Sequence, residues 1–221
     1  MDNKKQYQGV FAAALTPLTE TNAIALDDLP PFLDFLANRG CHGALLLGTT
    51  GEGPSFSVEQ RKSLMKMAAE WRNAYPSFML FVGVGTPSLD ETIRLTHSAF
   101  DFGMDAVLAL PPYYFRNVSD EGLFAWFQSI LKKAVPGDGA LFGYHIPKVT
   151  GAPLSIALLD RLLEAFPGNF VGIKASSADV EHAKSLGNHY GQDLFVFNGQ
   201  ESLLSTALEP HAVGWITALA N

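Results

Sequence analysis

Residues 44–71 read ALLLGTTGEGPSFSVEQRKSLMKMAAEW, and this stretch contains one complete unit of the expected fold. Four apolar residues come first, and a glycine-rich turn follows them. Residues 57–60 then have the spacing of a capping box, which predicts the start of a helix. The apolar residues of that helix fall on one face: Leu64, Met67, Ala68 and Trp71. A buried strand followed by an amphipathic helix is typical of parallel α/β proteins.

The same unit recurs along the chain. Eight short runs are apolar throughout, which indicates strands buried on both faces: Val10–Leu15, Ala44–Leu47, Met79–Val84, Ala106–Leu110, Ala140–Tyr144, Val171–Lys174, Leu194–Phe197 and Val213–Thr217. The clearest helices are expected at Asp27–Arg39, after a second capping box at residues 88–91 as far as about Phe102, at Ser119–Ala134 and at Ser155–Ala165.

Eight strands in series favour a closed (β/α)8 TIM barrel over an open doubly wound sheet. We expect a single domain over residues 1–221, because no linker or low-complexity tract divides the chain. The sequence ends directly after the eighth strand, so the expected barrel is C-terminally short and apparently lacks its eighth helix.

Composition excludes several classes of function. The chain has 15 basic and 22 acidic residues, a net charge of −7, and no basic run, which argues against nucleic acid and anionic membranes as partners. No apolar run is long enough to cross a bilayer, and the first ten residues lack the apolar core of a secretory signal, so a cytoplasmic enzyme is expected. Cys41 is the only cysteine, and the six histidines lack ligand spacing, so we expect neither a disulfide nor a metal site.

In a parallel barrel the chemistry lies where strands end and loops begin. After the second run, residues 48–53 read GTTGEG, whose N–H groups and hydroxyls could hold a carboxylate or phosphate; an ordinary glycine-rich turn is equally compatible. The sixth run, VGIKAS at residues 171–176, places Lys174 inside an apolar strand. Desolvation favours the neutral amine, which attacks carbonyl carbons, although a lysine at a strand end can also extend to solvent.

Two further strand ends carry aromatic side chains. Residues 144–151 read YHIPKVTG, and Tyr144 could transfer protons there or pack in the core with its hydroxyl satisfied. Residues 111–115 read PPYYF, which could form a rim, a subunit contact or part of a site.

These segments, in this order, resemble the dihydrodipicolinate synthase / N-acetylneuraminate lyase family of class I aldolases. The resemblance extends from Gly9-Val10 to the end of the chain. Its most specific parts are GTTGE at residues 48–52, Tyr-x-x-Pro-x-x-Thr-Gly at residues 144–151, and Gly-Ile-Lys at residues 172–174.

The resemblance implies a role for five side chains. Lys174 would form an imine with the keto carbon of pyruvate or a related 2-oxo acid. Thr49 and Thr50 would hold the substrate carboxylate, and Tyr144 would pass protons. Tyr114 resembles the family tyrosine that reaches into the neighbouring subunit's site, so that Thr49, Tyr144 and Tyr114 would form a proton relay.

The resemblance also implies that Gly199 and Ile216 line the pyruvate pocket. It implies a homo-oligomer, usually a tetramer built as a dimer of dimers, and a C-terminal helical segment that the printed sequence does not contain. The partners would be a 2-oxo acid, pyruvate, and an aldehyde. No cofactor or metal is needed, since the iminium itself withdraws electrons from the adjacent carbon.

Departures from the family pattern bear on the substrate. Where dihydrodipicolinate synthases have an arginine that binds the second, acidic substrate, this chain has Val149, and His145 replaces the usual asparagine. Thr49 differs from the serine typical of sialic-acid lyases. We therefore expect a lyase acting on a 2-keto-3-deoxy sugar acid or a similar 2-oxo acid. The alternatives are 4-hydroxy-tetrahydrodipicolinate synthase and a non-catalytic barrel that binds a 2-oxo acid.

Overall fold

Eight parallel strands pair in sequence order and close into one barrel, because β1 also pairs with β8. The computed structural model describes residues 7–200 and 212–221. The strands are β1 (Gly9–Ala13), β2 (Gly43–Leu46), β3 (Met79–Gly83), β4 (Ala106–Ala109), β5 (Leu141–His145), β6 (Phe170–Ala175), β7 (Phe195–Asn198) and β8 (Ala212–Thr217). The predicted barrel and its eight strands are confirmed, with small shifts in their ends.

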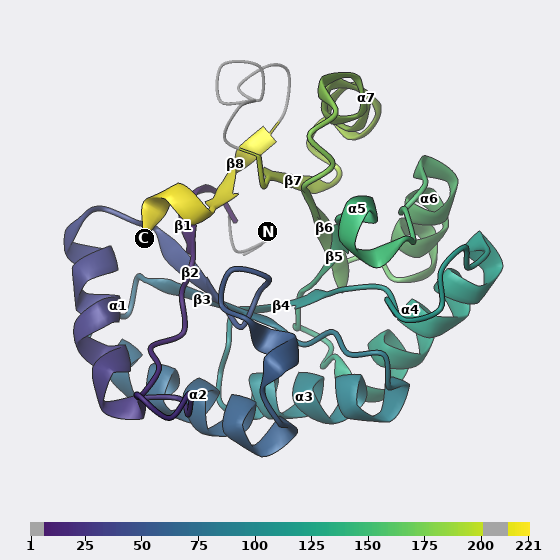
Figure 1. Ribbon diagram of the computed structural model, residues 1–221. Coiled ribbons are helices and arrows are strands. Elements are labelled where there is room, and N and C mark those ends of the chain that lie inside the picture. Colours follow the sequence, from purple (N-terminus) through teal and green to yellow (C-terminus); the bar gives the residue numbers. More distant parts are fainter. Residues whose placement is uncertain (1–6, 201–211) are drawn as a thin grey trace.

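Helices surround the strands, and α1, α2, α3, α4 and α6 form an arc around them in Figure 1. The α-helices are α1 (Leu29–Asn38), α2 (Val58–Trp71), α3 (Leu89–Asp101), α4 (Asp120–Ala134), α5 (Pro147–Thr150), α6 (Ile156–Ala165) and α7 (Val180–Tyr190). Short 3-10 turns are η1 (Leu26–Asp28), η2 (Gly53–Ser55), η3 (Arg72–Ala74) and η5 (Ala218–Ala220). The five predicted helices are present, whereas α5 and α7 were not located from the sequence.

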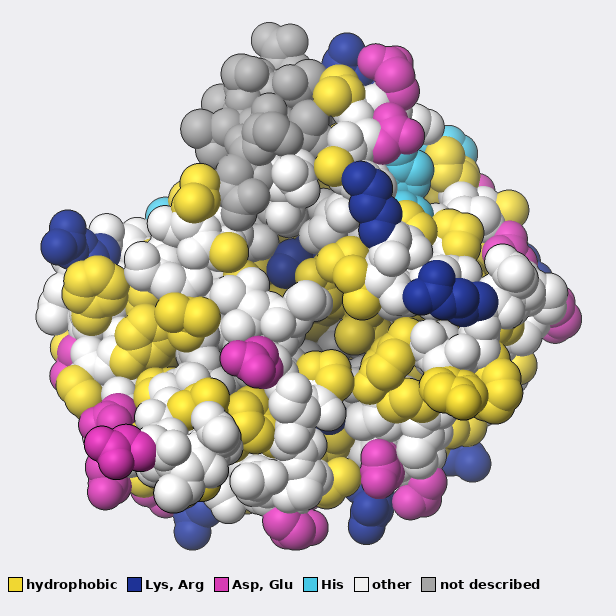
Figure 2. Space-filling model, in the orientation of Figure 1, with side chains coloured by type: hydrophobic (Ala, Val, Ile, Leu, Met, Phe, Trp, Pro, Cys, Tyr) yellow, Lys and Arg dark blue, Asp and Glu magenta, His cyan; other side chains and the backbone are white. Residues whose placement is uncertain are grey.

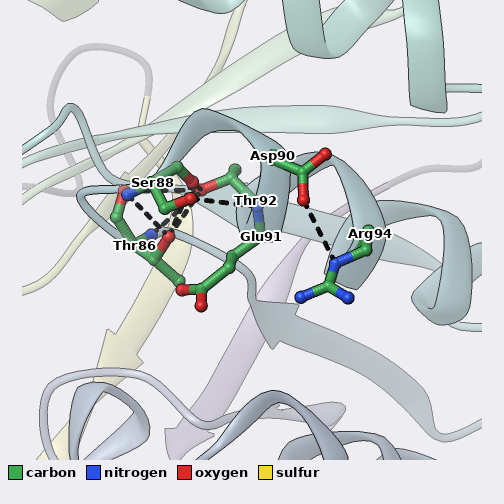
Figure 3. Close-up of polar contacts among 6 residues, drawn as sticks. All are labelled: Thr86, Ser88, Asp90, Glu91, Thr92 and Arg94. Carbon is green, nitrogen blue, oxygen red and sulfur yellow. Dashed lines mark hydrogen bonds and ion pairs between the residues drawn. The ribbon is translucent and has the colours of Figure 1, made fainter.

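The two predicted capping boxes differ in the structure. Ser57 and Gln60 form the reciprocal pair of hydrogen bonds at the start of α2. At α3 the Ser88 side chain accepts from the Glu91 N–H, but the structure gives no return bond from the Glu91 side chain. Instead, the hydroxyls of Thr86 and Thr92 bond to each other and to the backbone of residues 86–88, which fastens the β3–α3 connection to the helix (Figure 3).

Alternation along the strands separates two apolar clusters. One cluster fills the barrel interior and includes Phe11, Phe81, Phe142 and Phe197, all fully buried. The other lies between the strands and the helices. Side chains alternate between the two faces of a strand. Ile173 belongs to the outer cluster, so the side chain of the next residue, Lys174, points into the barrel.

The end of the chain is fastened to the first strand. After β8 the chain makes the turn η5, and the Asn221 side chain accepts a hydrogen bond from the Leu15 N–H at 2.9 Å and donates to the Ala13 carbonyl at 3.0 Å. These bonds lie at the C-terminal end of β1.

Within the two described ranges, no helix is both long and apolar enough to span a membrane.

Candidate active site

Lys174 lies near the end of β6 and is only 4% exposed. Its Nζ atom is 4.6 Å from the centre of the Tyr144 ring, which belongs to the neighbouring strand β5. The register of the sheet pairs these two residues directly. Lys174 thus lies at the end of the barrel where the loops that follow the strands begin.

The Tyr144 hydroxyl connects this strand pair to β2. Tyr144 is 3% exposed, and its hydroxyl lies 3.3 Å from the Thr49 Oγ1 atom, close enough for a hydrogen bond in which either oxygen can donate. Thr49 belongs to the turn after β2, three strands from β5 in the barrel order. The structure therefore brings Lys174, Tyr144 and Thr49 together, as a proton-transfer site requires.

The turn that carries Thr49 and Thr50 has an unusual backbone. Leu47 has a φ of +55°, in the left-handed region that costs energy for a residue with a side chain. Gly53 and Gly83 make room for it, because a Cβ atom at either position would collide with the Leu47 carbonyl. Within residues 7–200 and 212–221, the N–H groups of Thr49 and Thr50 donate no hydrogen bond. Both N–H groups can thus bind an anionic group.

Gly199 follows β7 and lies against Lys174. A Cβ atom at Gly199 would be 2.9 Å from Lys174 Cε and would overlap the Ser176 hydroxyl. The Gly199 N–H donates to the Ala175 carbonyl at 2.8 Å, which holds the two backbones together. A side chain at this position would displace the Ser176 and Lys174 side chains, and the role of Gly199 in lining the pocket stays a prediction.

The remaining predicted residues lie in two different environments. Ile216 of β8 is fully buried in the interior cluster that also contains Tyr144. Tyr114 lies on the β4–α4 connection and is 77% exposed, stacked edge-on against Phe115. Within a single chain the structure does not bring Tyr114 into contact with the Thr49–Tyr144 pair, so its role in a neighbouring subunit's site stays a prediction.

Ser176 and His182 lie beside the site and were not singled out from the sequence, and His145 was noted only because it replaces the family's asparagine. Ser176 lies two positions after Lys174, and its hydroxyl is buried with no hydrogen-bond partner among the described residues. His145, next to Tyr144, stacks on His182 of α7. The period of two along a strand could have identified Ser176, but the long-range stack left no signal in the sequence.

Figure 2 shows this face of the molecule hollowed at its centre, with one basic side chain at the floor and hydrophobic side chains on the side toward α4 and α5. A small cavity is lined by Tyr144 and by residues at or just after the ends of β2 and β3, among them Gly48, Gly83 and Gly85. Among the described residues there is no group of three or more His, Cys, Asp or Glu side chains arranged to hold a metal ion.

Comparison with known proteins places this geometry in a family. A model of the dihydrodipicolinate synthetase family matches residues 6–221. An uncharacterized DapA-like lyase from Chloroflexus aurantiacus is 40% identical over 215 residues, covering 97% of this chain and 70% of that protein. A 4-hydroxy-tetrahydrodipicolinate synthase from Prochlorococcus marinus is 32% identical, covering 96% of this chain and 68% of that protein.

Two solved structures show the same similarity in three dimensions. The dihydrodipicolinate synthase from Acinetobacter baumannii, complexed with pyruvate, superposes with a TM-score of 0.89 at 30% identity, covering 96% of this chain and 70% of that one. The 2-keto 3-deoxygluconate aldolase from Picrophilus torridus superposes with a TM-score of 0.88 at 27% identity, covering 97% and 74%. The chain belongs to the dihydrodipicolinate synthetase family and is a lyase of the class I pyruvate aldolase type.

Proposed function

We propose that Lys174 forms an imine with the keto carbon of pyruvate, and that the enzyme makes or breaks a carbon–carbon bond between pyruvate and an aldehyde. The complete substrate would be a 2-keto-3-deoxy sugar acid or a similar 2-oxo acid. The observation that carries the proposal is the buried Lys174 amine beside Tyr144, whose hydroxyl reaches Thr49.

Each step has a residue suited to it. The Lys174 amine adds to the keto carbon and water leaves, giving an iminium. Loss of a proton from the adjacent carbon gives an enamine, which attacks the aldehyde; the reverse sequence releases it. Tyr144, hydrogen-bonded to Thr49, is placed to move protons at the keto oxygen and at the aldehyde oxygen. The N–H groups of Thr49 and Thr50 would bind the carboxylate, and Gly199 and Ile216 would line the pocket.

Borohydride reduction tests the imine directly. Incubation with pyruvate and borohydride should add one reduced pyruvate to a peptide that contains Lys174, because reduction makes the imine permanent. Lys174→Met should abolish the addition, whereas Lys148→Met, which removes an exposed lysine of α5, should leave it unchanged. An intact protein of unchanged mass after this treatment would rule out the proposed chemistry.

The aldehyde partner separates two candidate reactions. Val149, at the position of the family arginine, is 49% exposed and offers no charge to an acidic aldehyde. This favours a 2-keto-3-deoxy acid. The synthase activity remains the second candidate because relatives near 30% identity carry that name. A panel of 2-keto-3-deoxy acids assayed for pyruvate release, beside pyruvate plus aspartate semialdehyde, distinguishes the two.

We also propose that the protein assembles as a homo-oligomer, a dimer of dimers in which Tyr114 of one subunit completes the site of another. The exposed aromatic pair Tyr114 and Phe115 supports this proposal, since large apolar side chains in solvent commonly mark contact surfaces. Sedimentation of the wild-type protein and of Tyr114→Ala tests the assembly. A cytoplasmic location stays a prediction.

A further inference from the structure

Two histidines that take no part in the proposed chemistry lie beside the site. His145 is the last residue of β5 and is 3% exposed, and His182 lies in the first turn of α7. Their rings are nearly parallel, with centroids 4.3 Å apart and an angle of 13° between the planes. The Nδ1 atom of His145 accepts a hydrogen bond from the Leu154 N–H at 3.1 Å, so the position of that ring is fixed on a second side.

The connection between β6 and α7 is fastened to His145 at both of its ends. At the beginning of the connection, the Ser176 N–H donates to the His145 carbonyl at 2.8 Å. At its end, Asp179 caps the helix by accepting from the His182 N–H at 3.1 Å, and the His182 ring stacks on the His145 ring. Residues 176–179 therefore form a short segment held between two contacts with one residue.

This segment borders the reactive lysine and needs such support. The Ser176 hydroxyl is buried, and a Cβ atom built at Gly199 would meet both this hydroxyl and Lys174 Cε. The two side chains therefore border the same space, and a shift of Ser176 would change the space around the lysine side chain. Ala178 has a φ of +59°, a left-handed conformation that a residue with a side chain adopts only when its surroundings impose it. Without the two contacts to His145, this segment should relax to other conformations.

The charges around the pair are compatible with stacking at neutral pH. Burial, and to a lesser extent the neighbouring His182, lower the pKa of His145 to about 4. Burial also lowers the pKa of His182, while Asp179 on the same helix opposes that effect. From β6 the facing residue is Ala175, which pairs with His145 in the sheet, and the α5–α6 connection contributes the Leu154 N–H. Both rings are thus neutral at pH 7 and do not repel each other.

We propose that His145 and His182 are a positioning pair whose stack holds residues 176–179 against Lys174 and so keeps the site in the form that binds the 2-oxo acid. The inference rests on the proposed function, because it assigns the pair a role in pyruvate binding. If the pair is lost, only a fraction of molecules holds the binding form, and the apparent dissociation constant rises in inverse proportion to that fraction. Saturating pyruvate selects the binding form again, so the maximal rate should change little.

Titration with pyruvate under borohydride trapping measures the half-saturating pyruvate concentration and the maximal trapping rate separately. His182→Ala should raise the half-saturating pyruvate concentration about tenfold and leave the maximal trapping rate within about twofold. His182→Phe keeps a flat ring on His145 and should restore the wild-type half-saturation within about twofold. Lys184→Ala, an exposed change on the same helix, is the matched control and should behave as wild type. Hydrogen exchange of the residue 176–179 amides should accelerate in His182→Ala alone.

Three results would overturn the inference: a His182→Ala variant with wild-type half-saturation, a His182→Phe variant as impaired as His182→Ala, or a fall confined to the maximal rate. If His182→Ala folds poorly, His182→Leu takes its place, since it fills similar space without a flat ring. A wild-type protein that forms no pyruvate adduct contradicts the proposed function itself, whereas normal trapping in wild type and in every variant contradicts only the positioning role.

Discussion

Replacement of Gly199 by alanine tests the contact on which the geometry of the site depends. An added Cβ atom would lie 2.9 Å from Lys174 Cε and would overlap the Ser176 hydroxyl. Carbon atoms in contact prefer a separation of about 3.5–4.0 Å, so the lysine side chain has to withdraw by roughly 0.6–1.1 Å. The Ser176 side chain must rotate or move as well, since its hydroxyl occupies the same space.

A displacement of this size should be visible in the chemistry. A misplacement of about 1 Å can cost on the order of 100-fold in rate, because the amine no longer approaches the keto carbon in a productive geometry. We therefore expect Gly199→Ala to slow borohydride trapping of pyruvate by about 10- to 100-fold. Overpacking should also lower the free energy of unfolding by about 1–3 kcal/mol, measured in urea.

Gly137→Ala is the matched control, since a Cβ atom at Gly137 would meet nothing within 4 Å. It should trap pyruvate at the wild-type rate. Adding Ser176→Ala to Gly199→Ala removes the overlap with the hydroxyl but not the contact with Lys174, so stability should recover more than the trapping rate. Wild-type trapping kinetics in folded Gly199→Ala would refute the conclusion that Gly199 packs against the lysine.

Two further changes test the barrel around the site. Gly172→Ala places a Cβ atom against the Phe142 ring and 2.5 Å from the Phe195 carbonyl, so it should lower the free energy of unfolding in urea by about 1–3 kcal/mol; an unchanged value would contradict this packing. Acid should also destabilise the fold: the pKa of His145 falls from 6.5 to about 4 on folding, so between these values the unfolded chain binds more protons and stability decreases as pH falls. At pH 4.5 this effect alone is worth roughly 2–3 kcal/mol relative to pH 7.5, and His145→Gln should remove it from the measured difference; equal pH dependence in both proteins would refute the assignment.

The sequence predicted the barrel because its strands are unusually uniform. Runs such as residues 79–84 and 106–110 are apolar on both faces, which indicates a parallel sheet covered on both sides, and the number of such runs then favours the closed barrel. Helix α7 was not located, although Val180, Ala183, Leu186 and Tyr190 repeat at helical spacing and lie on one face. The segment has few large apolar side chains and contains Gly187, a residue with low helix propensity.

The candidate site was predictable where single residues sit at strand ends. Lys174 and Tyr144 stand out because one is charged in an apolar strand and the other precedes a proline-containing turn, and the structure places both at adjacent strand ends. The support around them was not predictable. The left-handed Leu47, the buried hydroxyl of Ser176 and the stack on His182 depend on contacts between segments far apart in the sequence.

The filling of the barrel determines from which side a substrate can reach the amine. Below Lys174 the interior is packed with phenylalanine rings, among them Phe81 and Phe142, and Tyr7 contacts both of them edge-on. Because interiors are packed about as densely as organic crystals, these rings, among the described residues, block the way to the lysine from that end. In the proposed reaction the keto acid therefore approaches from the loops that follow the strands. Val149 of α5, which follows β5, lies on that side of the barrel and is the proposed contact to the aldehyde.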